Sequence, residues 1–377
     1  MGCCRPPSFA IDQGTVIMML QHDLLADTGN ARSRLLVVQP LVGIGDMVWH
    51  KPWIDHLAAH FDVTLACKPT AKAPILFSGT DGIVGWISIE RSLRGSKGRH
   101  DGPLGLLRLA SAFRRSGADQ VLIMHHSATY AMAARLAGIP HRWGYGIGGS
   151  RQWLNRGAFL GREARYEHPT RKLARFAQMN GFGLASPQWR MPPTADAQGA
   201  ADSWCDHLGI PAFGTSADGV RDMVVMGVGA MDGERQWPPA HFAALAKRLK
   251  DVAPAMRILV MGAPSEQPII DAVLADPSAP ADLIPNMAPL DEAIALINAA
   301  RLYVGNDTSL LNIAAACGRP AAGVFAQSTP LDYSEVFVPI VVPDGRFGEP
   351  GAIARITADQ AFDVVADVLA GQQTAKR

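Results

Sequence analysis

At 377 residues, the chain is too long for one ordinary globular core, and the usual domain size suggests two units or one very large α/β sheet. Hydrophobic residues make up 48% of the sequence and charged residues 18%, which excludes a disordered or polyelectrolyte chain. The 35 Lys and Arg residues nearly balance the 34 Asp and Glu residues, so no net field draws the protein to nucleic acid.

The cysteines and the N-terminal segment bear on location. The cysteines are odd in number and lack metal-ligand spacing, which argues against a disulfide framework and a zinc site and favours a reducing compartment. They lie at Cys3, Cys4, Cys67, Cys205 and Cys317. No stretch approaches the roughly 18 apolar residues that span a bilayer. We therefore expect a cytoplasmic protein with no metal and no transmembrane segment, and a disordered N-terminal extension at residues 1–33.

Alternation of strands and helices begins at Arg34. The apolar run at 35–39 is typical of a strand buried on both faces, and a glycine-rich turn and a helical pattern follow it. In the first half of the chain we expect strands at 35–39, 62–67 and 120–124, helices at 47–60 and 170–179, and an exposed basic loop at 91–100.

A second series of strands and helices starts near Met223. We expect strands at 223–227, 257–262, 302–305 and 321–325, and helices at 238–250, 290–300 and 309–317. Strands that alternate with helices indicate parallel sheets covered on both faces. The sequence therefore predicts an α/β protein with two Rossmann-like domains that face a central cleft.

Composition sets the domain boundaries that we expect. Residues 34–195 form the N-terminal domain and residues 220–345 form the C-terminal domain. Between them, residues 196–219 are rich in Ala, Gly, Ser and Asp and are expected to be a linker region. Residues 346–377 are expected to form a C-terminal tail and helix.

Four segments that follow predicted strands carry candidate functional residues. In the first, the glycines of Gly43-Ile44-Gly45-Asp46 allow a ligand to approach the backbone. Asp46 is either a catalytic carboxylate or only the N-cap of the next helix. As a dinucleotide-binding fingerprint the segment is weak, because Val48 stands in place of the third glycine.

The second and third segments carry one charged candidate each. After the glycine-rich turn at 227–233, Arg235 could neutralise a phosphate before a helix N-terminus, or be only a solvated side chain. After Gly262, Glu266 could accept hydrogen bonds from both hydroxyls of a ribose, or cap the next helix.

The fourth segment, Gly305–Asn312, enters a helix whose free N–H groups form an anion site together with the hydroxyls of Thr308 and Ser309. Because an acid beside a phosphate would repel it, a functional Asp307 would bind sugar hydroxyls; otherwise Asp307 is only the N-cap. The sequence has no D-x-D pair, so a metal-bridged diphosphate is not implied.

These four segments, in this order and spacing, resemble glycosyltransferase family 9, the heptosyltransferases of lipopolysaccharide core assembly. The resemblance runs from about Arg34 to about Pro330, with a weaker match near 357–369. It rests on four stretches: LLVVQPLVGIGDMVWHKPWIDHL, RQWPPAHFAALAKRL, MGAPSE and, most specifically, VGNDTSLLNIAAACGRPAAGVFAQSTP.

The resemblance implies a GT-B fold, in which the N-terminal domain faces the acceptor and the C-terminal domain holds the nucleotide sugar. It implies that transfer inverts the anomeric configuration. By position, Asp46 would be the catalytic base. The implied donor-binding residues are Gly229, Arg235, Glu266, Met287, Asp307, Thr308 and Ser309. The implied acceptor-side residues are Gly45, His168 and Lys172.

Three residues depart from the family pattern. Arg235 stands in place of Lys, Ser309 in place of Gly, and Asn312 in place of His. These departures leave the donor identity open, and they favour a non-catalytic sugar- or nucleotide-binding relative as one alternative. A nucleotide-sugar epimerase of the same fold is a second, and a nicotinamide-dependent oxidoreductase is a third, which the missing glycine disfavours.

The function that we expect is an inverting, metal-independent transfer of heptose or a related sugar. The donor would be a nucleotide sugar, with ADP-heptose as one candidate, and no other cofactor is implied. The acceptor would be a lipopolysaccharide-type or other glycan, placed at the cytoplasmic face of the inner membrane if it is a glycolipid. The loop with Arg91, Arg94, Lys97 and Arg99 could meet an anionic acceptor, or be only a solvated surface.

Overall fold

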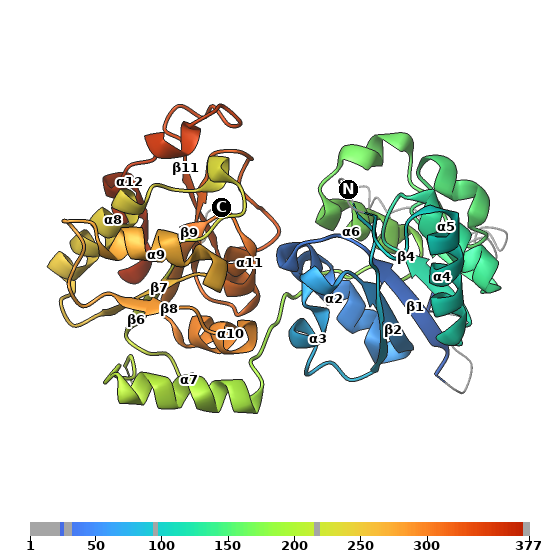
Figure 1. The fold of residues 1–377 in the computed structure, drawn as a ribbon, viewed down its shortest axis with the longest axis horizontal. Coiled ribbons are helices and arrows are strands. Elements are labelled where there is room, and N and C mark those ends of the chain that lie inside the picture. Colours follow the sequence, from blue (N-terminus) through green and yellow to red (C-terminus); the bar gives the residue numbers. More distant parts are fainter. Residues whose placement is uncertain (1–22, 26–31, 93–96, 215–218, 372–377) are drawn as a thin grey trace, which may run out of the picture. The chain divides into compact units, whose positions relative to one another are not determined.

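The computed structural model describes residues 23–25, 32–92, 97–214 and 219–371 (Figure 1). Most of the expected N-terminal extension, and Arg94 of the basic loop, therefore lie outside the described residues. Within that extension, the side chain of Leu24 is fully buried and its N–H donates a hydrogen bond to the Asn180 carbonyl at 3.0 Å.

Internal contacts divide the described chain into two compact units. The first contains the residues up to Val42, together with His50–Lys72 and Thr80–Pro187. The second contains Gly43–Trp49, Ala73–Gly79 and the residues from Gln188 onward.

The first unit is built on a five-stranded parallel sheet with strand order β3-β2-β1-β4-β5. Its strands are β1 (Arg34–Gln39), β2 (Asp62–Cys67), β3 (Ile83–Ser88), β4 (Gln120–Ile123) and β5 (His141–Gly144). The helices in this half of the chain are α2 (Ile44–His60), α3 (Ala73–Leu76), α4 (Gly102–Arg115), α5 (Ala128–Ala137) and α6 (Pro169–Met179). Short 3₁₀ helices lie at η1 (Pro69–Ala71), η2 (Gly148–Trp153) and η3 (Arg162–Tyr166).

The second unit is built on a six-stranded parallel sheet with strand order β11-β10-β9-β6-β7-β8. Its strands are β6 (Met223–Gly227), β7 (Arg257–Met261), β8 (Ile284–Asn286), β9 (Leu302–Asn306), β10 (Ala321–Phe325) and β11 (Phe337–Val341). Its helices are α7 (Ala195–His207), α8 (Pro239–Val252), α9 (Gln267–Leu274), α10 (Leu290–Ala299), α11 (Ser309–Ala316) and α12 (Ala358–Leu369). Short 3₁₀ helices lie at η4 (Gly233–Arg235), η5 (Pro264–Glu266) and η6 (Ala352–Arg355).

Each strand and helix that the apolar patterns predicted is present, with ends shifted by a few residues at most. The pattern did not single out β3, β5, β8 and β11, nor α3, α4, α5, α7 and α9. Strands β8 and β11 contain Pro285 and Pro339, and both lie at edges of the sheet, where a missing N–H is tolerated. The segment at 196–219, expected to be a linker, includes most of α7.

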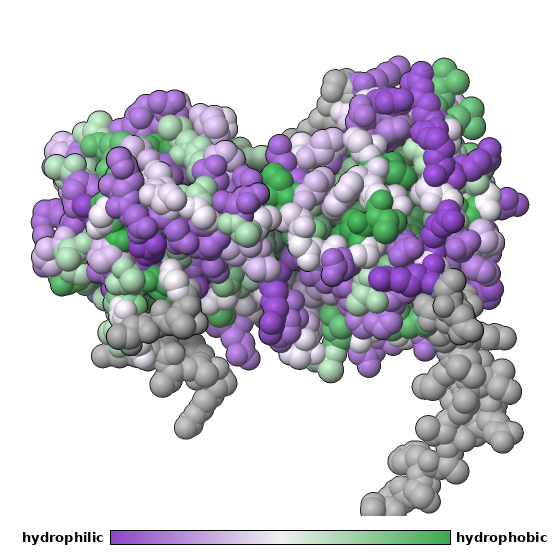
Figure 2. Space-filling model, turned by 90° about the horizontal axis from the view of Figure 1, so that it is seen from below, coloured by the Kyte–Doolittle hydropathy of each residue, from purple (hydrophilic) through white to green (hydrophobic). Residues whose placement is uncertain are grey.

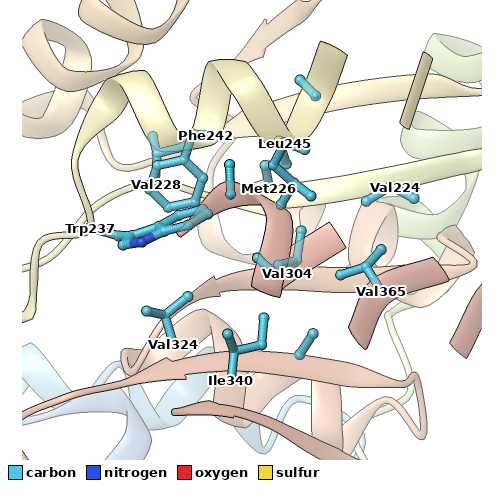
Figure 3. Close-up of a cluster of buried hydrophobic side chains, with 14 of the residues drawn as sticks. Val224, Met226, Val228, Trp237, Phe242, Leu245, Val304, Val324, Ile340 and Val365 are labelled. Carbon is cyan, nitrogen blue, oxygen red and sulfur yellow. The ribbon is translucent and has the colours of Figure 1, made fainter. Parts of the chain in front are cut away.

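The core of the second unit lies between its sheet and helices α8 and α12 (Figure 3). Trp237 is fully buried, and its ring packs edge-on against Phe242 with ring centroids 4.7 Å apart. Its indole Nε1 donates a hydrogen bond of 2.8 Å to the carbonyl of Ile356, just before α12. None of the helices in the described part of the chain has the length and apolar composition that crossing a bilayer requires.

We predict that Trp237→Phe lowers the free energy of unfolding by about 1–3 kcal/mol, because it removes the bond to Ile356 and part of the packed ring. Urea denaturation followed by circular dichroism measures this. Met231→Ala is the control, because Met231 is 96% exposed and its loss should change stability by less than about 0.5 kcal/mol. Equal stability of the two variants would contradict the structural role of Trp237.

Candidate active site

The residues predicted to bind a donor gather at one edge of the second sheet. Gly229 follows β6, Glu266 follows β7, Met287 follows β8, and Asp307 follows β9. These four strands are neighbours and all parallel, so their carboxyl ends lie along the same edge. The chain runs outward in one direction from β6 and in the other from β9, which makes the β6–β9 boundary the topological switch point where ligands bind in such sheets.

Glycine is required at position 229 because the Glu266 carboxylate occupies the space beside it. A Cβ atom at Gly229 would lie 1.9 Å from Oε2 of Glu266. Oε2 accepts a hydrogen bond of 2.7 Å from the N–H of Ala263, at the start of η5. The carboxylate is therefore held over the end of β6 by its own turn, although Glu266 belongs to the segment after β7.

Arg235 and Asp307 form an ion pair at the switch point. Arg235 Nη1 lies 3.6 Å from Asp307 Oδ2, which also accepts a hydrogen bond of 3.3 Å from the Ser328 hydroxyl. The Asp307 side chain is only 14% exposed, whereas that of Arg235 is 45% exposed. Burial raises the pKa of Asp307, and both Arg235 and Ser328 oppose that rise. A strong cation thus stands at the solvent side of a mostly buried acid.

Asn306 is a positioning residue to which the sequence analysis gave no role. It is fully buried at the end of β9, and its Oδ1 accepts the N–H of Trp237 at 3.0 Å. Its Nδ2 donates to the carbonyls of Val228 and Gly229 at 2.9 and 3.1 Å. The amide therefore fixes the turn after β6 and the segment that carries Arg235. The sequence feature that could have identified this residue is an Asn at the end of an otherwise apolar strand.

The start of α11 is polar and half-buried. Thr308 occupies the N-cap position, and its hydroxyl makes no capping bond to the helix. The Ser309 hydroxyl accepts a hydrogen bond of 3.3 Å from the N–H of Gly45. A Cβ atom at Gly45 would lie 3.2 Å from Nδ2 of Asn312, so glycine allows the two segments to approach closely.

Asn312 is buried, and both the nitrogen and the oxygen of its amide form hydrogen bonds. Nδ2 donates to the carbonyl of Thr308 at 2.8 Å. Oδ1 accepts from Nε1 of Trp49 at 2.7 Å and from the hydroxyl of Tyr333 at 2.5 Å. The residue that departs from the family pattern therefore connects α11 to the start of α2 and to the loop before β11.

Asp46 is the third residue of α2 and not its N-cap. Its Oδ2 accepts a hydrogen bond of 2.8 Å from the N–H of Gly43, as the third residue of a capping box does. Burial raises the pKa of Asp46, and the bond from Gly43 partly opposes this rise. A carboxylate that holds its proton more strongly than usual is a better general base near neutral pH.

The first unit has its own switch point between β1 and β4, and a histidine pair follows β4 there. The rings of His125 and His126 stack with centroids 4.4 Å apart. Burial, followed by nearby His126, Lys172, Arg91 and His50, lowers the pKa of His125 to about 3. His125 Nδ1 accepts the N–H of Ser127 at 3.0 Å, as a neutral imidazole can. The sequence analysis missed this pair, although it directly follows a predicted strand.

The predicted acceptor-side residues of α6 differ in their surroundings. His168 is the N-cap of α6, and its Nδ1 accepts the N–H of Thr170 at 3.4 Å. Lys172 is buried, and its Nζ donates to the Arg165 carbonyl at 3.1 Å. The charge of Lys172 lowers the pKa of both His125 and His126, which places the ammonium group near the histidine pair.

Comparison with known proteins identifies relatives over much of the chain. The sequence model of glycosyltransferase family 9 (heptosyltransferase) matches residues 106–340. Lipopolysaccharide heptosyltransferase 2 of Escherichia coli (strain K12) is 27% identical over 236 residues, which is 59% of this chain and 64% of the relative. The match thus spans less than two thirds of that relative.

Two solved structures share the fold. The structure of E. coli ADP-heptose LPS heptosyltransferase II has a TM-score of 0.66 at 19% identity and covers 90% of this chain and 100% of that chain. The glycosyltransferase family 9 structure from Veillonella parvula DSM 2008 has a TM-score of 0.73 at 15% identity, covering 92% and 100%. The predicted α/β fold of the GT-B type is confirmed.

The raised pKa of Asp46 predicts a pH-dependent stability difference. Because the folded chain disfavours the ionised carboxylate, Asp46 contributes stability below its ordinary pKa of 3.8 that is lost as pH rises through the raised value. Asn cannot ionise and still accepts the Gly43 N–H. The melting temperature of Asp46→Asn, relative to wild type, should therefore increase from pH 4 to pH 8.

Asp276→Asn is the matched control with the opposite sign. Hydrogen bonds from Ser278 lower the pKa of the half-buried Asp276, so its contribution to stability is present at higher pH and lost on acidification. The melting temperature of Asp276→Asn, relative to wild type, should decrease from about pH 2 to pH 4 and stay nearly constant from pH 4 to pH 8, because the lowered pKa lies below the ordinary value of 3.8. A flat or falling difference for Asp46→Asn would show that burial does not control this carboxyl group.

Proposed function

The chain belongs to glycosyltransferase family 9, the heptosyltransferases, and we propose that it transfers a heptose or related sugar from a nucleotide sugar to a glycan acceptor. The names of its relatives support ADP-heptose as donor and a lipopolysaccharide-type acceptor. The observation that carries the proposal is the Arg235–Asp307 pair at the switch point of the second sheet, with Glu266 held over Gly229 beside it.

The proposed donor site assigns one chemical group to each residue. Glu266 accepts hydrogen bonds from the ribose hydroxyls, since its carboxylate lies over the glycine-lined end of β6. The half-buried Met287 packs on the nucleotide base. Asp307 accepts hydrogen bonds from the hydroxyls of the transferred sugar. Arg235 stands between this acid and solvent, where it neutralises the diphosphate that Asp307 alone would repel.

Asp46 is the proposed catalytic base. A sugar hydroxyl is a very weak acid, so attack on the anomeric carbon needs a positioned proton acceptor. Asp46 lies one residue after Gly45, whose N–H contacts Ser309 at the start of α11. The attacking oxygen forms a bond to the anomeric carbon while its proton passes to the Asp46 carboxylate. The bond to the leaving diphosphate breaks on the opposite face, and the configuration inverts.

Negative charge grows on the diphosphate as that bond breaks. Arg235 and the N–H groups at the start of α11 are placed to stabilise it, because they are fixed before the reaction begins. The hydroxyls of Thr308 and Ser309 add donors at the same helix end. This arrangement supports a transfer that does not depend on a metal bridge, in agreement with the missing D-x-D pair.

The acceptor is proposed to be anionic and to meet the cations at the switch point of the first unit. Burial lowers the pKa of His125 after β4 most, and the nearby His126, Lys172 and Arg91 lower it further. A phosphate or carboxylate on the acceptor would relieve this repulsion. We place the reaction in the cytoplasm, at the membrane surface when the acceptor is a glycolipid.

A non-catalytic sugar-binding protein is the alternative that Asn312 favours. Its amide is used by Thr308, Trp49 and Tyr333, so it supplies structure where a histidine could supply a cation near the leaving group. Transfer of radiolabelled sugar from ADP-heptose to a heptose-deficient lipopolysaccharide core decides between the two. Donor binding without transfer to any core acceptor would favour the alternative.

We predict that Asp46→Asn reduces turnover by roughly 10²–10⁴-fold, the usual contribution of a positioned general base. The affinity for the donor should remain nearly unchanged, because Asp46 is not assigned a contact with it. The transfer rate, donor affinity by calorimetry and melting temperature are measured on one preparation. Wild-type turnover in this variant would remove Asp46 from the mechanism.

We predict that Arg235→Ala and Glu266→Ala weaken binding of nucleoside diphosphate by about 10–100-fold each, because each removes hydrogen bonds to or from a charged group. Asp307→Ala should weaken binding of the nucleotide sugar far more than binding of the nucleoside diphosphate, since the proposed partner of Asp307 is the sugar. Calorimetry with ADP and with ADP-heptose separates these effects.

Arg346→Ala is the matched control for the loss of an arginine, because this side chain is 70% exposed and lies outside the proposed site. It should leave both affinities unchanged. If Arg235→Ala binds ADP like the control, its role at the phosphates is wrong. If Asp307→Ala lowers the affinity for both ligands equally, the assignment of Asp307 to the sugar is wrong.

A further inference from the structure

We propose that the groove between β3 and α4 in the first unit, with the exposed face of α4, docks the protein on an anionic phospholipid bilayer. This surface is separate from the switch points described above. The proposal does not depend on the chemistry proposed for the second unit, because it concerns where the protein sits and not what it transfers.

The groove lies at the edge of the sheet of the first unit, between β3 and α4. Strand β3 is an edge strand, and its residues alternate between half-buried and exposed. Val84 and Trp86 are 62% and 42% exposed. Gly85 and Ile87 lie on the other face of β3, and with Thr64 of β2 and residues of α4 they line a groove of about 630 Å³. Hydrophobic residues (green) reach the surface of this unit among hydrophilic ones (purple) on the right of Figure 2.

The lining of the groove is strongly cationic. Its arginines are Arg34, Arg99, Arg108 and Arg115. The acids in the lining are Asp62 and Glu90, and Asp62 is paired with Arg32 at 3.4 Å. Over the described ranges of the chain, none of the four arginines forms an ion pair with an acid. Their charges therefore remain available to phosphate groups outside the protein.

Helix α4 extends this surface with exposed leucines. Leu104 and Leu107 are 69% and 56% exposed, and they lie on the same solvent face as Arg108 and Arg115. The helix contains no Asp or Glu. Arg108 and Arg115 belong both to the groove and to this face, so the two form one continuous surface.

This combination fits a bilayer better than a protein or nucleic acid partner. A helix with arginines and leucines on its exposed face and no acid is typical of segments that lie in a membrane interface. Leucines enter the acyl boundary and arginines contact the lipid phosphates. The groove gives a lipid headgroup room beside Arg108 and Arg115.

Vesicle flotation with the full chain tests the proposal. Wild type should bind vesicles of phosphatidylglycerol and phosphatidylcholine, bind pure phosphatidylcholine far less, and release as salt is raised. Each arginine near an anionic surface strengthens binding by about fivefold, so Arg108→Gln/Arg115→Gln should weaken it by about 25-fold. Leu104→Ser/Leu107→Ser should weaken it by about tenfold or more.

The matched controls lie next to the same surface. Arg114→Gln changes an arginine of α4 whose guanidinium donates to the carbonyls of Leu136 and Ala137. Leu136→Ser changes a leucine of α5 that is 42% exposed. Both should float like wild type. The other variants should keep the wild-type melting temperature because their altered side chains are exposed, whereas Arg114→Gln should lower it slightly because the bonds to the two carbonyls are lost.

Several results would overturn the proposal. Equal binding to neutral and anionic vesicles would remove the role of the arginines, and no binding to either would remove the surface altogether. Concentration-dependent dimers that form without vesicles, and that the Arg108/Arg115 variant abolishes, would assign the surface to a second copy of the chain. Because no donor or acceptor is present, failure here leaves the proposed transfer reaction untouched.

Discussion

The second unit depends on one buried amide. Asn306 ends a central strand with no exposure to solvent, and its side chain bonds to the turn after β6 and to the backbone before α8. Unpaired polar groups at this depth would cost free energy, so the three segments hold one another in place. Trp237 continues this constraint outward, because its ring fills the core and its N–H reaches the segment before α12.

That constraint places opposite charges where strand order reverses. Asn306 bonds to the backbone on both sides of the segment that carries Arg235, and Asp307 directly follows Asn306 in the chain. The same residue therefore positions both members of the Arg235–Asp307 ion pair. Glu266 reaches the same region from β7, and Gly229 leaves the space that its carboxylate fills. The site is thus organised without ligand, which reduces the rearrangement that binding and bond cleavage require.

The residues that depart from the family pattern have clear partners in the structure. The Ser309 hydroxyl meets the N–H of Gly45, and the Asn312 amide bridges Thr308, Trp49 and Tyr333. A histidine at position 312 could not make all of these bonds with the same shape. The chain therefore uses this position to join the start of α2 to α11, and Asp46 lies between the two residues of α2 that make the contacts.

The sequence by itself determined the α/β class, most buried strands and the segments of the candidate site. Apolar runs such as 35–39 and 302–305 predict strands because both faces of a parallel sheet are buried, and turns with Gly, Asp or Glu after such runs mark the binding edge. Strands β8 and β11 were missed because each contains a proline, which normally argues against a strand. Only their position at the edge of the sheet makes the proline acceptable. Only the tertiary structure decided which residues meet. The pairing of Arg235 with Asp307, the clamp by Asn306 and the position of Asp46 within α2 join segments through strand order and helix ends, which local sequence does not encode.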